Sequence, residues 1–293
     1  MHEEIKALAQ AIEALQPETN YIKDYAVPIL VPFLSAALGG LVAHQAFRAQ
    51  ESMEIEKSKL DTANKWFLLA DGAQQELIAI KQNYYRELTS NPIQRAGAIP
   101  VTPINTRPIV DGYEGLSFIV PSAKDGQGQV PKWSQVSRIR MMIENFNYSL
   151  ELWKSRNEYQ QQFMEALSNA YGDDAFTGKI SIDDVVKVVG RVPVMRHFQL
   201  TELAVALTDD LIKEMVDFLE NFPAHVKGKI NLKKIKGYGS VLTWQLPDNA
   251  KAREVRQKCV KVDFSNVEKL LGELGETVET MKVRCSTGYE EEE

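Results

Sequence analysis

One stretch near the N-terminus constrains the fold more than any other part of this sequence. It is Tyr25–Ala43, which reads YAVPILVPFLSAALGGLVA and has no charged side chain between Asp24 and His44. About 19 residues of α-helix, at about 1.5 Å per residue, nearly match the roughly 30 Å hydrocarbon thickness of a bilayer. The stretch therefore predicts a transmembrane helix, which we extend to residues 25–47.

Two alternatives to a membrane span have to be weighed. A buried helix in a large soluble core has a similar length, but Pro28 and Pro32 would disturb an ordinary soluble helix more than a membrane helix. A cleaved signal peptide would have a short basic leader, whereas this leader is long and acidic. Its acidic residues are Glu3, Glu4, Glu13, Glu18 and Asp24. We therefore expect an uncleaved anchor.

The second half of the apolar run has small side chains at small-xxx-small spacing. These residues are Ser35, Ala36, Gly39, Gly40 and Ala43. A helix face without long side chains lets a neighbouring backbone approach closely, so the spacing predicts self-association or packing on a partner membrane protein. The simpler alternative is that glycine and alanine are common in membrane helices.

Composition limits the number of spans and the class of partner. A hydrophobic content of 44% and a charged content of 25% are typical of a soluble domain with one anchor, and not of a multi-span channel. The formal net charge is -6. Because nucleic-acid affinity depends on a positive field at the phosphates, a nucleic-acid partner is not expected. Membrane lipid is the expected partner.

Cysteine use and flanking charge predict the compartment. Cys259 and Cys285 are far apart and form no CxxC motif, which fits a reducing cytoplasm. The basic residues close to the run are one before it and three after it, namely Lys23 and then Arg48, Lys57 and Lys59. By the positive-inside rule we place the protein in the inner (cell) membrane as a single-pass protein, with the N-terminus outside and the large domain in the cytoplasm.

Apolar residues recur every three or four positions through most of the remaining chain, which predicts a mainly α fold: a transmembrane helix that runs into a cytosolic helical bundle. Helices are expected over 133–171 and 265–283, and over about 194–221 with Pro223 as the stop. The expected segments are 1–24 (amphipathic), 25–47 (transmembrane), 48–90 (long connecting helix), 91–132 (Pro/Gly-rich loop region, without regular helix over 91–112 and with a short helix or strand over 113–121), 133–283 (helical domain packing on 48–90) and 284–293 (acidic tail).

One segment departs from the helical pattern. Residues 228–246 alternate apolar and polar side chains around GYG, which predicts a small β-hairpin. Five lysines cluster at its start, at Lys227, Lys229, Lys233, Lys234 and Lys236. They are candidate contacts for anionic lipid or for the acidic tail Glu290–Glu293. RNA binding and a simple solvated surface are the alternatives.

No motif for catalysis is present, and the four histidines lie in four different segments. The nearest approach to a metal site is Asp173–Asp184, DDAFTGKISIDD, which partly follows the calcium-loop spacing. Ala175 replaces one ligand and the final aspartate is short, so we expect no metal there. We predict no catalytic residue and no cofactor, and that the protein is not an enzyme.

The function expected from the sequence is that of a single-pass membrane-anchored helical protein acting through protein interaction, assembly or signalling. The first alternative is a membrane-perturbing, toxin-like effector of a bacterial antiviral defence system. In that case the helical domain would hold the anchors inactive until a trigger arrives. The second alternative is a membrane-anchored enzyme whose site is assembled from distant residues.

Overall fold

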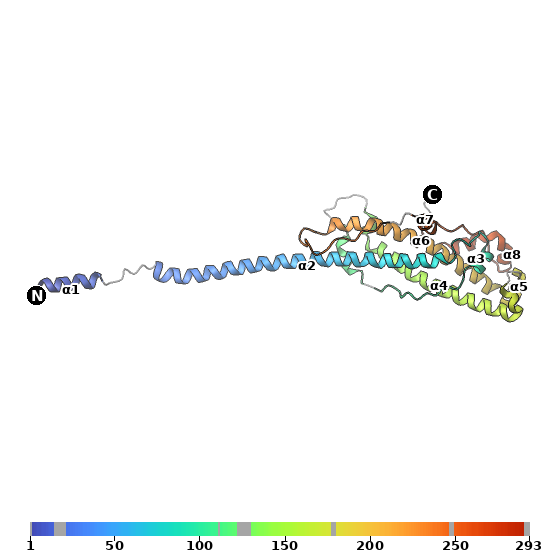
Figure 1. The fold of residues 1–293 in the computed structure, drawn as a ribbon, viewed down its shortest axis with the longest axis horizontal. Helices are drawn as coiled ribbons and strands as arrows, with labels where there is room; N and C mark the ends of the chain where they lie inside the picture. Colours follow the sequence, from blue (N-terminus) through green and yellow to red (C-terminus); the bar gives the residue numbers. More distant parts are fainter. Residues whose placement is uncertain are drawn as a thin grey trace. The chain divides into compact units, whose positions relative to one another are not determined.

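The computed structural model describes residues 2–14, 22–110, 112–121, 130–176, 180–245 and 249–289. The chain divides into two compact units, Met1–Ile55 and Glu56–Glu293, here called unit 1 and unit 2. The described part of the chain is helical and contains no strand (Figure 1). The mainly α prediction is therefore confirmed.

Unit 1 contains α1 (His2–Ala14), a π-helical turn η1 (Ile22–Ala26) and the first part of α2 (Val27–Gln82). The segment 1–24, expected to be amphipathic, contains α1, whose residues are all exposed. Pro28 is in the first turn of α2, where a missing N–H costs no helical bond, whereas Pro32 is inside the helix.

The part of α2 that belongs to unit 2 buries one face. Its buried apolar residues recur every three or four positions: Leu60, Ala63, Trp66, Phe67, Ala70, Leu77 and Ile80. The helix ends at Gln82, earlier than the predicted residue 90. Asn83 explains the stop, because its side chain donates to the carbonyl of Ala79 at 2.9 Å. Asparagine that bonds the preceding turn in this way competes with the next helical hydrogen bonds.

The main core of unit 2 lies between α2, α4 (Val136–Tyr171) and α6 (Arg191–Lys229), which run alongside one another in Figure 1. Trp153 of α4 is fully buried and donates from Nε1 to Oγ1 of Thr208 on α6 at 2.9 Å. Its ring lies 5.4 Å from that of Tyr84, in the turn after α2. One tryptophan thus contacts both neighbouring segments.

The prediction that Pro223 stops α6 is wrong. The helix continues for about two further turns to Lys229, with Pro223 inside it. Proline removes one backbone hydrogen bond and typically costs about 3 kcal/mol in a helix interior. Here Phe222, Pro223 and Val226 are all buried. Burial of about 2 kcal/mol per large apolar side chain offsets that cost.

The expected loop over 91–132 contains regular structure. Helix α3 (Pro92–Ala98) begins with Pro92 at its first position, and the side chain of Asn91 accepts from the Ile93 N–H at 2.9 Å. Proline at this position is well suited to helix entry, so the absence of helix predicted from proline content is wrong here. The 3-10 turns η2 (Glu114–Ile119) and η4 (Lys132–Ser134) follow.

A second core gathers at one end of unit 2, where Figure 1 shows α3, α5 (Ile182–Val189) and α8 (Glu268–Glu273) close together. It also includes the start of α6 and the last short elements of the chain. These last elements are η6 (Phe264–Val267), α8 and α9 (Val278–Arg284). The two elements of unit 2 not yet mentioned are η5 (Gly172–Phe176) and α7 (Ala250–Arg256).

The single helix predicted over 265–283 is split between α8 and α9. Gly275 has φ +72°, and the Glu276 N–H donates to the carbonyl of Leu271 at 2.9 Å. A left-handed glycine with this bonding pattern is a common helix ending. The turn lets both short helices bury apolar side chains, including Leu271 and Met281.

The β-hairpin predicted over 228–246 is wrong for the residues that the structure describes, 228–245. Residues up to Lys229 belong to α6, and the following residues form turns. Backbone groups of this segment bond to side chains of α2 instead of to a second strand. The Asn231 N–H donates to Glu56 at 2.7 Å and the Leu242 N–H donates to Asn64 at 2.9 Å. Side chains of α2 thus supply the acceptors for these two backbone donors.

Candidate functional site

The apolar part of α2 is the most unusual surface of unit 1. Its large side chains are exposed: Ile29 is 71% exposed, Phe33 is 73% exposed and Val42 is 66% exposed. The helix is long and apolar enough to cross a membrane, and 0% of its apolar window is buried. Contiguous apolar surface of this kind is rare on soluble monomers and marks an interaction with lipid or with another protein.

The five small residues of the predicted packing face all lie on α2 and are all exposed. A methyl group added at Gly39 or at Gly40 would meet nothing within 4 Å. Nothing in the described residues of the chain therefore packs against these two positions. The face is open to a neighbouring helix, and substitutions there leave the fold of the single chain undisturbed.

The five predicted lysines fall in two local structures. Lys227 and Lys229 are in the last turn of α6, where a positive charge is favourable near the helix C-terminus. Lys233, Lys234 and Lys236 are exposed in the turns that follow, around the buried side chain of Ile235. Ile235 fixes the turn to the domain while the lysines point outward.

The segment 231–242 is held along α2 by several polar contacts. Besides the bonds from Asn231 and Leu242, the Tyr238 hydroxyl donates to Asp61 at 2.6 Å. Lys57 lies 5.2 Å from the centre of the Tyr238 ring. The structure thus brings the lysines of 227–236 to the first turns of α2 in unit 2, which also carry lysines. Sequence spacing alone did not reveal this pairing.

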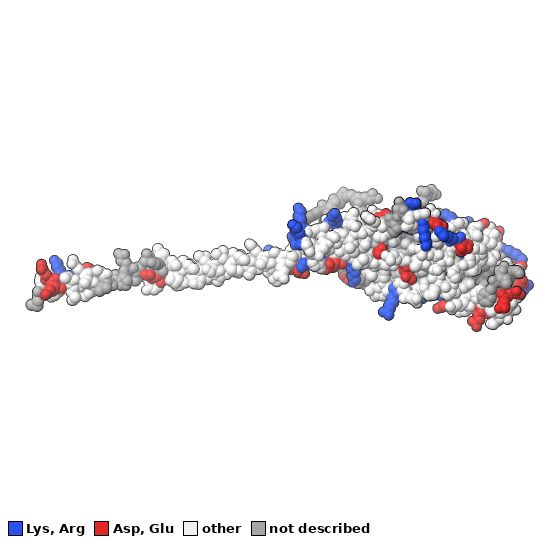
Figure 2. Space-filling model, in the orientation of Figure 1, with Lys and Arg blue, Asp and Glu red and all other residues white. Residues whose placement is uncertain are grey.

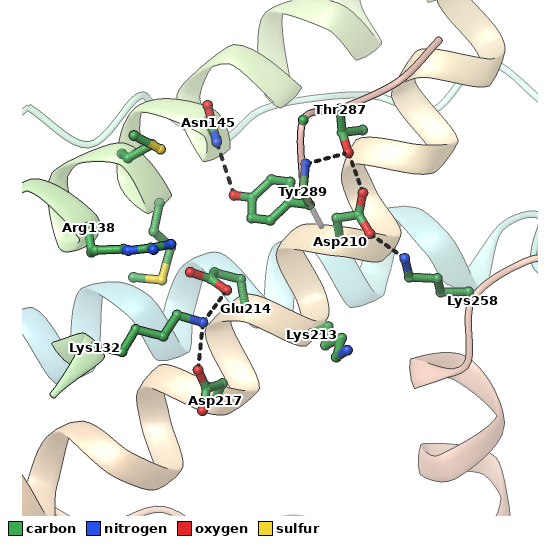
Figure 3. Close-up of a pocket in the computed structure, with 13 residues that line it drawn as sticks. Lys132, Arg138, Asn145, Asp210, Lys213, Glu214, Asp217, Lys258, Thr287 and Tyr289 are labelled. Atoms are coloured by element: carbon green, nitrogen blue, oxygen red, sulfur yellow. Dashed lines mark hydrogen bonds and ion pairs between the residues drawn. The ribbon is translucent and has the colours of Figure 1, made fainter. Parts of the chain in front are cut away.

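A polar cavity of about 460 Å³ lies in unit 2 between α4, α6 and the end of the described chain (Figure 3). Lys132 stands at one side of it, with Nζ 2.7 Å from Glu214 and 2.8 Å from Asp217. Burial lowers the pKa of Lys132, but the two carboxylates outweigh it and raise the pKa above its ordinary value. Lys132 is therefore a permanent cation that bridges η4 to α6.

The end of the described chain forms another wall of this cavity. Thr287 donates to Asp210 at 2.5 Å, and Asn145 donates to the Tyr289 hydroxyl at 3.0 Å (Figure 3). Burial raises the pKa of Tyr289 to about 12, so the phenol stays neutral at physiological pH. These contacts tie the chain end to α4 and α6, and they offer binding groups without an activated nucleophile.

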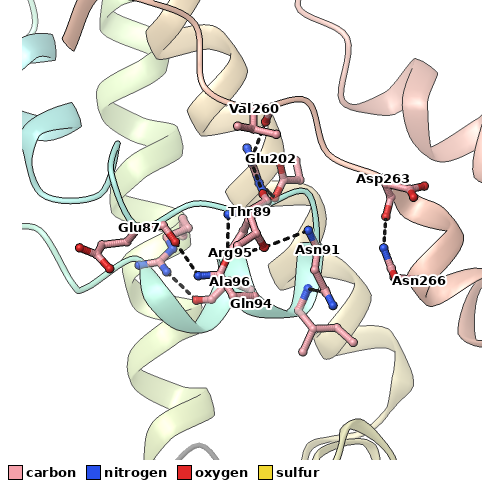
Figure 4. A network of polar contacts seen from close by, with 12 residues as sticks. Glu87, Thr89, Asn91, Gln94, Arg95, Ala96, Glu202, Val260, Asp263 and Asn266 are labelled. Atoms are coloured by element: carbon pink, nitrogen blue, oxygen red, sulfur yellow. Dashed lines mark hydrogen bonds and ion pairs between the residues drawn. The ribbon is translucent and has the colours of Figure 1, made fainter. Parts of the chain in front are cut away.

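A buried ion pair joins α3 to α6. Arg95 donates from Nε to Glu202 at 2.8 Å, and both side chains are 3% exposed. The same guanidinium donates to the carbonyls of Thr89 and Val260 at 3.0 and 2.7 Å (Figure 4). Burial raises the pKa of Glu202 despite the opposing charge of Arg95. The network thus holds together the loop before α3 and the segment after α7. Arg95 and Val260, which it joins, are 165 residues apart in the chain.

A second buried ion pair joins α2 to α6. Lys81, which is 0% exposed, lies 2.5 Å from Asp209 and donates to the carbonyl of Gln257 at 2.6 Å. The other carboxylate oxygen of Asp209 accepts from the Cys259 N–H at 2.6 Å. Burial, followed by the Asp209 charge, raises the pKa of Cys259 to about 12. That thiol is a structural neighbour, since a nucleophile needs a lowered pKa.

Arg156 of α4 is a third buried cation, and it bonds to backbone. It donates to the carbonyls of Ala96, Ile99 and Pro100, at 2.9, 2.6 and 3.2 Å, which lie at and just after the end of α3. Burial lowers the pKa of Arg156 to about 10, so the side chain stays charged at neutral pH. Its role is to satisfy the last carbonyls of a short helix.

His197 makes unit 2 sensitive to acid. Burial, and next the Arg156 charge, lower the pKa of His197 to about 4 from an unfolded value near 6.5. Between these values the unfolded state binds more protons, so stability is full above pH about 6.5 and falls as the pH falls toward 4. We expect a loss of about 3 kcal/mol at the lower end, and a shallower loss in His197→Gln. Denaturant unfolding followed by tryptophan fluorescence at several pH values measures the loss in the unmodified protein and in the variant. An equal change of unfolding free energy with pH in the two proteins would contradict the prediction.

The weak calcium-loop pattern is not assembled as a site in the described residues. Thr177 and Gly178 lie outside them. Ser181 accepts the Asp184 N–H at 3.2 Å and so caps α5. Across the described ranges, no group of three or more His, Cys, Asp or Glu side chains is placed to hold a metal ion. The acidic residues Glu290–Glu293, expected partners of the lysines, also lie outside the described chain.

Comparison with known proteins adds no relative. The chain matches no protein-family model, no curated protein and no solved structure. Three features of the described chain bear on function: the exposed apolar helix, the lysine-rich segment and the polar cavity. The first two were predicted from the sequence. The cavity was not, because its lining comes from four segments that are far apart in the chain.

Proposed function

We propose that this protein is a single-pass membrane protein whose helical domain acts through protein interaction, assembly or signalling. The observation that carries the proposal is the apolar window of α2, which is 0% buried in the described structure. Water around such a surface is unfavourable, by about 25 cal/mol per Å² of apolar area, whereas hydrocarbon accepts it. Inner-membrane location and a cytoplasmic domain follow from the flanking positive charges.

Assembly would proceed through the small-residue face of the same helix. In a bilayer, helices associate by close packing because lipid is as apolar as leucine, so a face of small side chains favours contact. Two copies joined in this way would bring two helical domains to the same place on the membrane. Each domain then supplies polar surface, including the cavity at Tyr289, for a further partner.

Membrane insertion is tested with the full chain expressed in bacteria. We expect it to remain in the membrane pellet after alkaline carbonate extraction, because about 19 apolar residues hold it in hydrocarbon. Protease added to intact spheroplasts should leave the domain whole, and lysis should expose it. Full release by carbonate would contradict anchoring, and digestion before lysis would contradict the orientation.

Association through the span is tested with Gly39→Ile/Gly40→Ile. A Cβ atom added at either position meets nothing within 4 Å, so we expect the monomer to tolerate the change, whereas the larger side chain pushes a neighbouring backbone away. We expect loss of the crosslinked dimer that the unmodified protein forms in membranes.

Gly72→Ile is the matched control, since Gly72 is also on α2, also has open space, and belongs to unit 2. The control should crosslink like the unmodified protein. A dimer that persists in the Gly39/Gly40 variant would remove the packing face from the proposal.

A further inference from the structure

The lysine-rich segment and the adjoining turns of α2 form a strongly positive surface on an acidic protein. We call residues 56–65 and 227–242 together the basic collar. The collar carries eight lysines and only two carboxylates, a formal charge of +6, whereas the whole chain has -6. Figure 2 shows blue side chains gathered at the left end of unit 2. The collar is therefore net positive on a net negative chain, while lysine and arginine side chains also lie elsewhere on unit 2 (Figure 2).

Both carboxylates of the collar already have hydrogen-bond donors within it. Glu56 accepts from Lys59 at 2.8 Å and from the Asn231 N–H at 2.7 Å. Asp61 accepts from the Tyr238 hydroxyl. The two acidic groups thus hold the two halves of the collar together.

The collar is tied closely to the apolar run by the chain itself. Glu56 is the first residue of unit 2 and follows Ala43 by roughly a dozen residues. A helical connection of that length is about 20 Å, and an extended one is below about 45 Å. Because Asn231 and Leu242 are bonded to α2 at Glu56 and Asn64, the lysines between them share this tether.

We propose that the basic collar binds the anionic headgroups of the membrane that the α2 segment enters, an inference that rests on the proposed membrane anchoring. Lysine ammonium groups are compact, mobile point charges that suit lipid phosphates. Each lysine close to an anionic surface contributes about 1 kcal/mol, and the attraction fades within a Debye length of about 8 Å. The span keeps the collar on a tether of about 20 to 45 Å, so the collar must lie against the bilayer for this short-range attraction to act.

The test measures lysine reactivity in the full-length protein by mass spectrometry. The protein is reconstituted into phosphatidylcholine vesicles with or without phosphatidylglycerol and treated with an amine reagent. We expect Lys233 and Lys236 to react about fivefold more slowly with phosphatidylglycerol, in line with the contribution of each lysine. Lys251 and Lys269, exposed on α7 and α8, serve as internal controls and should not change. High salt should abolish the difference.

Other outcomes separate the explanations. Equal rates in both lipids, or equal slowing at all four lysines, would overturn the collar proposal. Slowing by inorganic phosphate in plain phosphatidylcholine would assign the lysines to a free anion and also overturn it. Carbonate extraction of the same phosphatidylcholine vesicles reports the anchor separately. A retained protein with unprotected lysines would thus reject the collar alone, whereas a released protein would reject the anchor.

Variants test whether the collar acts as a unit. In Lys233→Glu/Lys236→Glu, Lys227 should lose its protection by phosphatidylglycerol, because the local positive field is weakened. The matched Lys251→Glu/Lys269→Glu variant makes the same charge change on other elements and should leave Lys227 protected. Protection of Lys227 that survives the first variant, or is lost equally in both, would contradict a collective lipid contact.

Discussion

Leu34→Lys/Leu38→Lys is expected to release the full-length chain from membranes into the soluble or aggregated fraction. Both leucines are exposed on α2, at 57% and 61%, in the centre of the apolar run. A lysine at the centre of a membrane helix is unfavourable by about 2.5–3.5 kcal/mol, so two cost about 5–7 kcal/mol. Within the described residues, nothing buries the apolar window of α2 and shields these positions. The measurement is the fraction that remains in the pellet after alkaline carbonate extraction.

The control places the same change on exposed apolar residues of unit 2. Leu68 is 58% exposed and Val283 is 68% exposed. Leu68→Lys/Val283→Lys should pellet like the unmodified protein, because water already surrounds these positions. If the Leu34/Leu38 variant were retained as firmly as this control, α2 would not be the anchor and the exposed apolar window would need a protein partner instead.

Asp209→Ala is expected to lower the unfolding free energy of unit 2 by about 3–5 kcal/mol. The substitution leaves the ammonium group of Lys81 fully buried without a counter-charge, and it removes the acceptor of the Cys259 N–H. The four tryptophans all lie in unit 2, so denaturant unfolding followed by their fluorescence reports on that unit. Acid-induced loss at His197 is avoided by measuring at neutral pH.

Two further variants decide whether the buried charge is the cause. Glu254→Ala breaks the Arg86–Glu254 pair, which is exposed at 58% and 44%, and should leave the unfolding free energy close to that of the unmodified protein. Lys81→Met/Asp209→Asn removes both charges and keeps an acceptor for Cys259, so it should recover most of the loss. A double variant as unstable as Asp209→Ala would show that packing, and not the uncompensated charge, dominates at this position.

The end of α4 at Tyr171 was predicted correctly, because local chemistry decides it. Gly172 follows as the C-cap with a φ of +57°, which suits glycine. Such signals depend on residues within one turn of each other, which is why a sequence carries them. The exposure of Lys233 and Lys236 also follows from the sequence, because a charged lysine side chain stays hydrated in most folds.

Two of the errors share one physical origin. The stop at Pro223 and the hairpin over 228–246 were judged from local propensity. In both cases tertiary packing reversed the outcome: apolar burial around Pro223, and α2 beside residues 231–242. Packing between segments outweighs local preferences of about 1–3 kcal/mol, and one sequence does not reveal it. Helix α3 differs, because its own Asn91 cap and Pro92 favour the helix.

By itself, the sequence determined the mainly helical class, the apolar run and the positions of its small residues, because helical periodicity and freedom from charge are local properties. The tertiary structure alone decided that the lysines of 227–236 lie on the first turns of α2 in unit 2, and that Lys81 meets Asp209. It also decided that a polar cavity forms at Tyr289. These arrangements depend on which helices pack together, and packing is set by the summed burial of whole faces, not by any single motif.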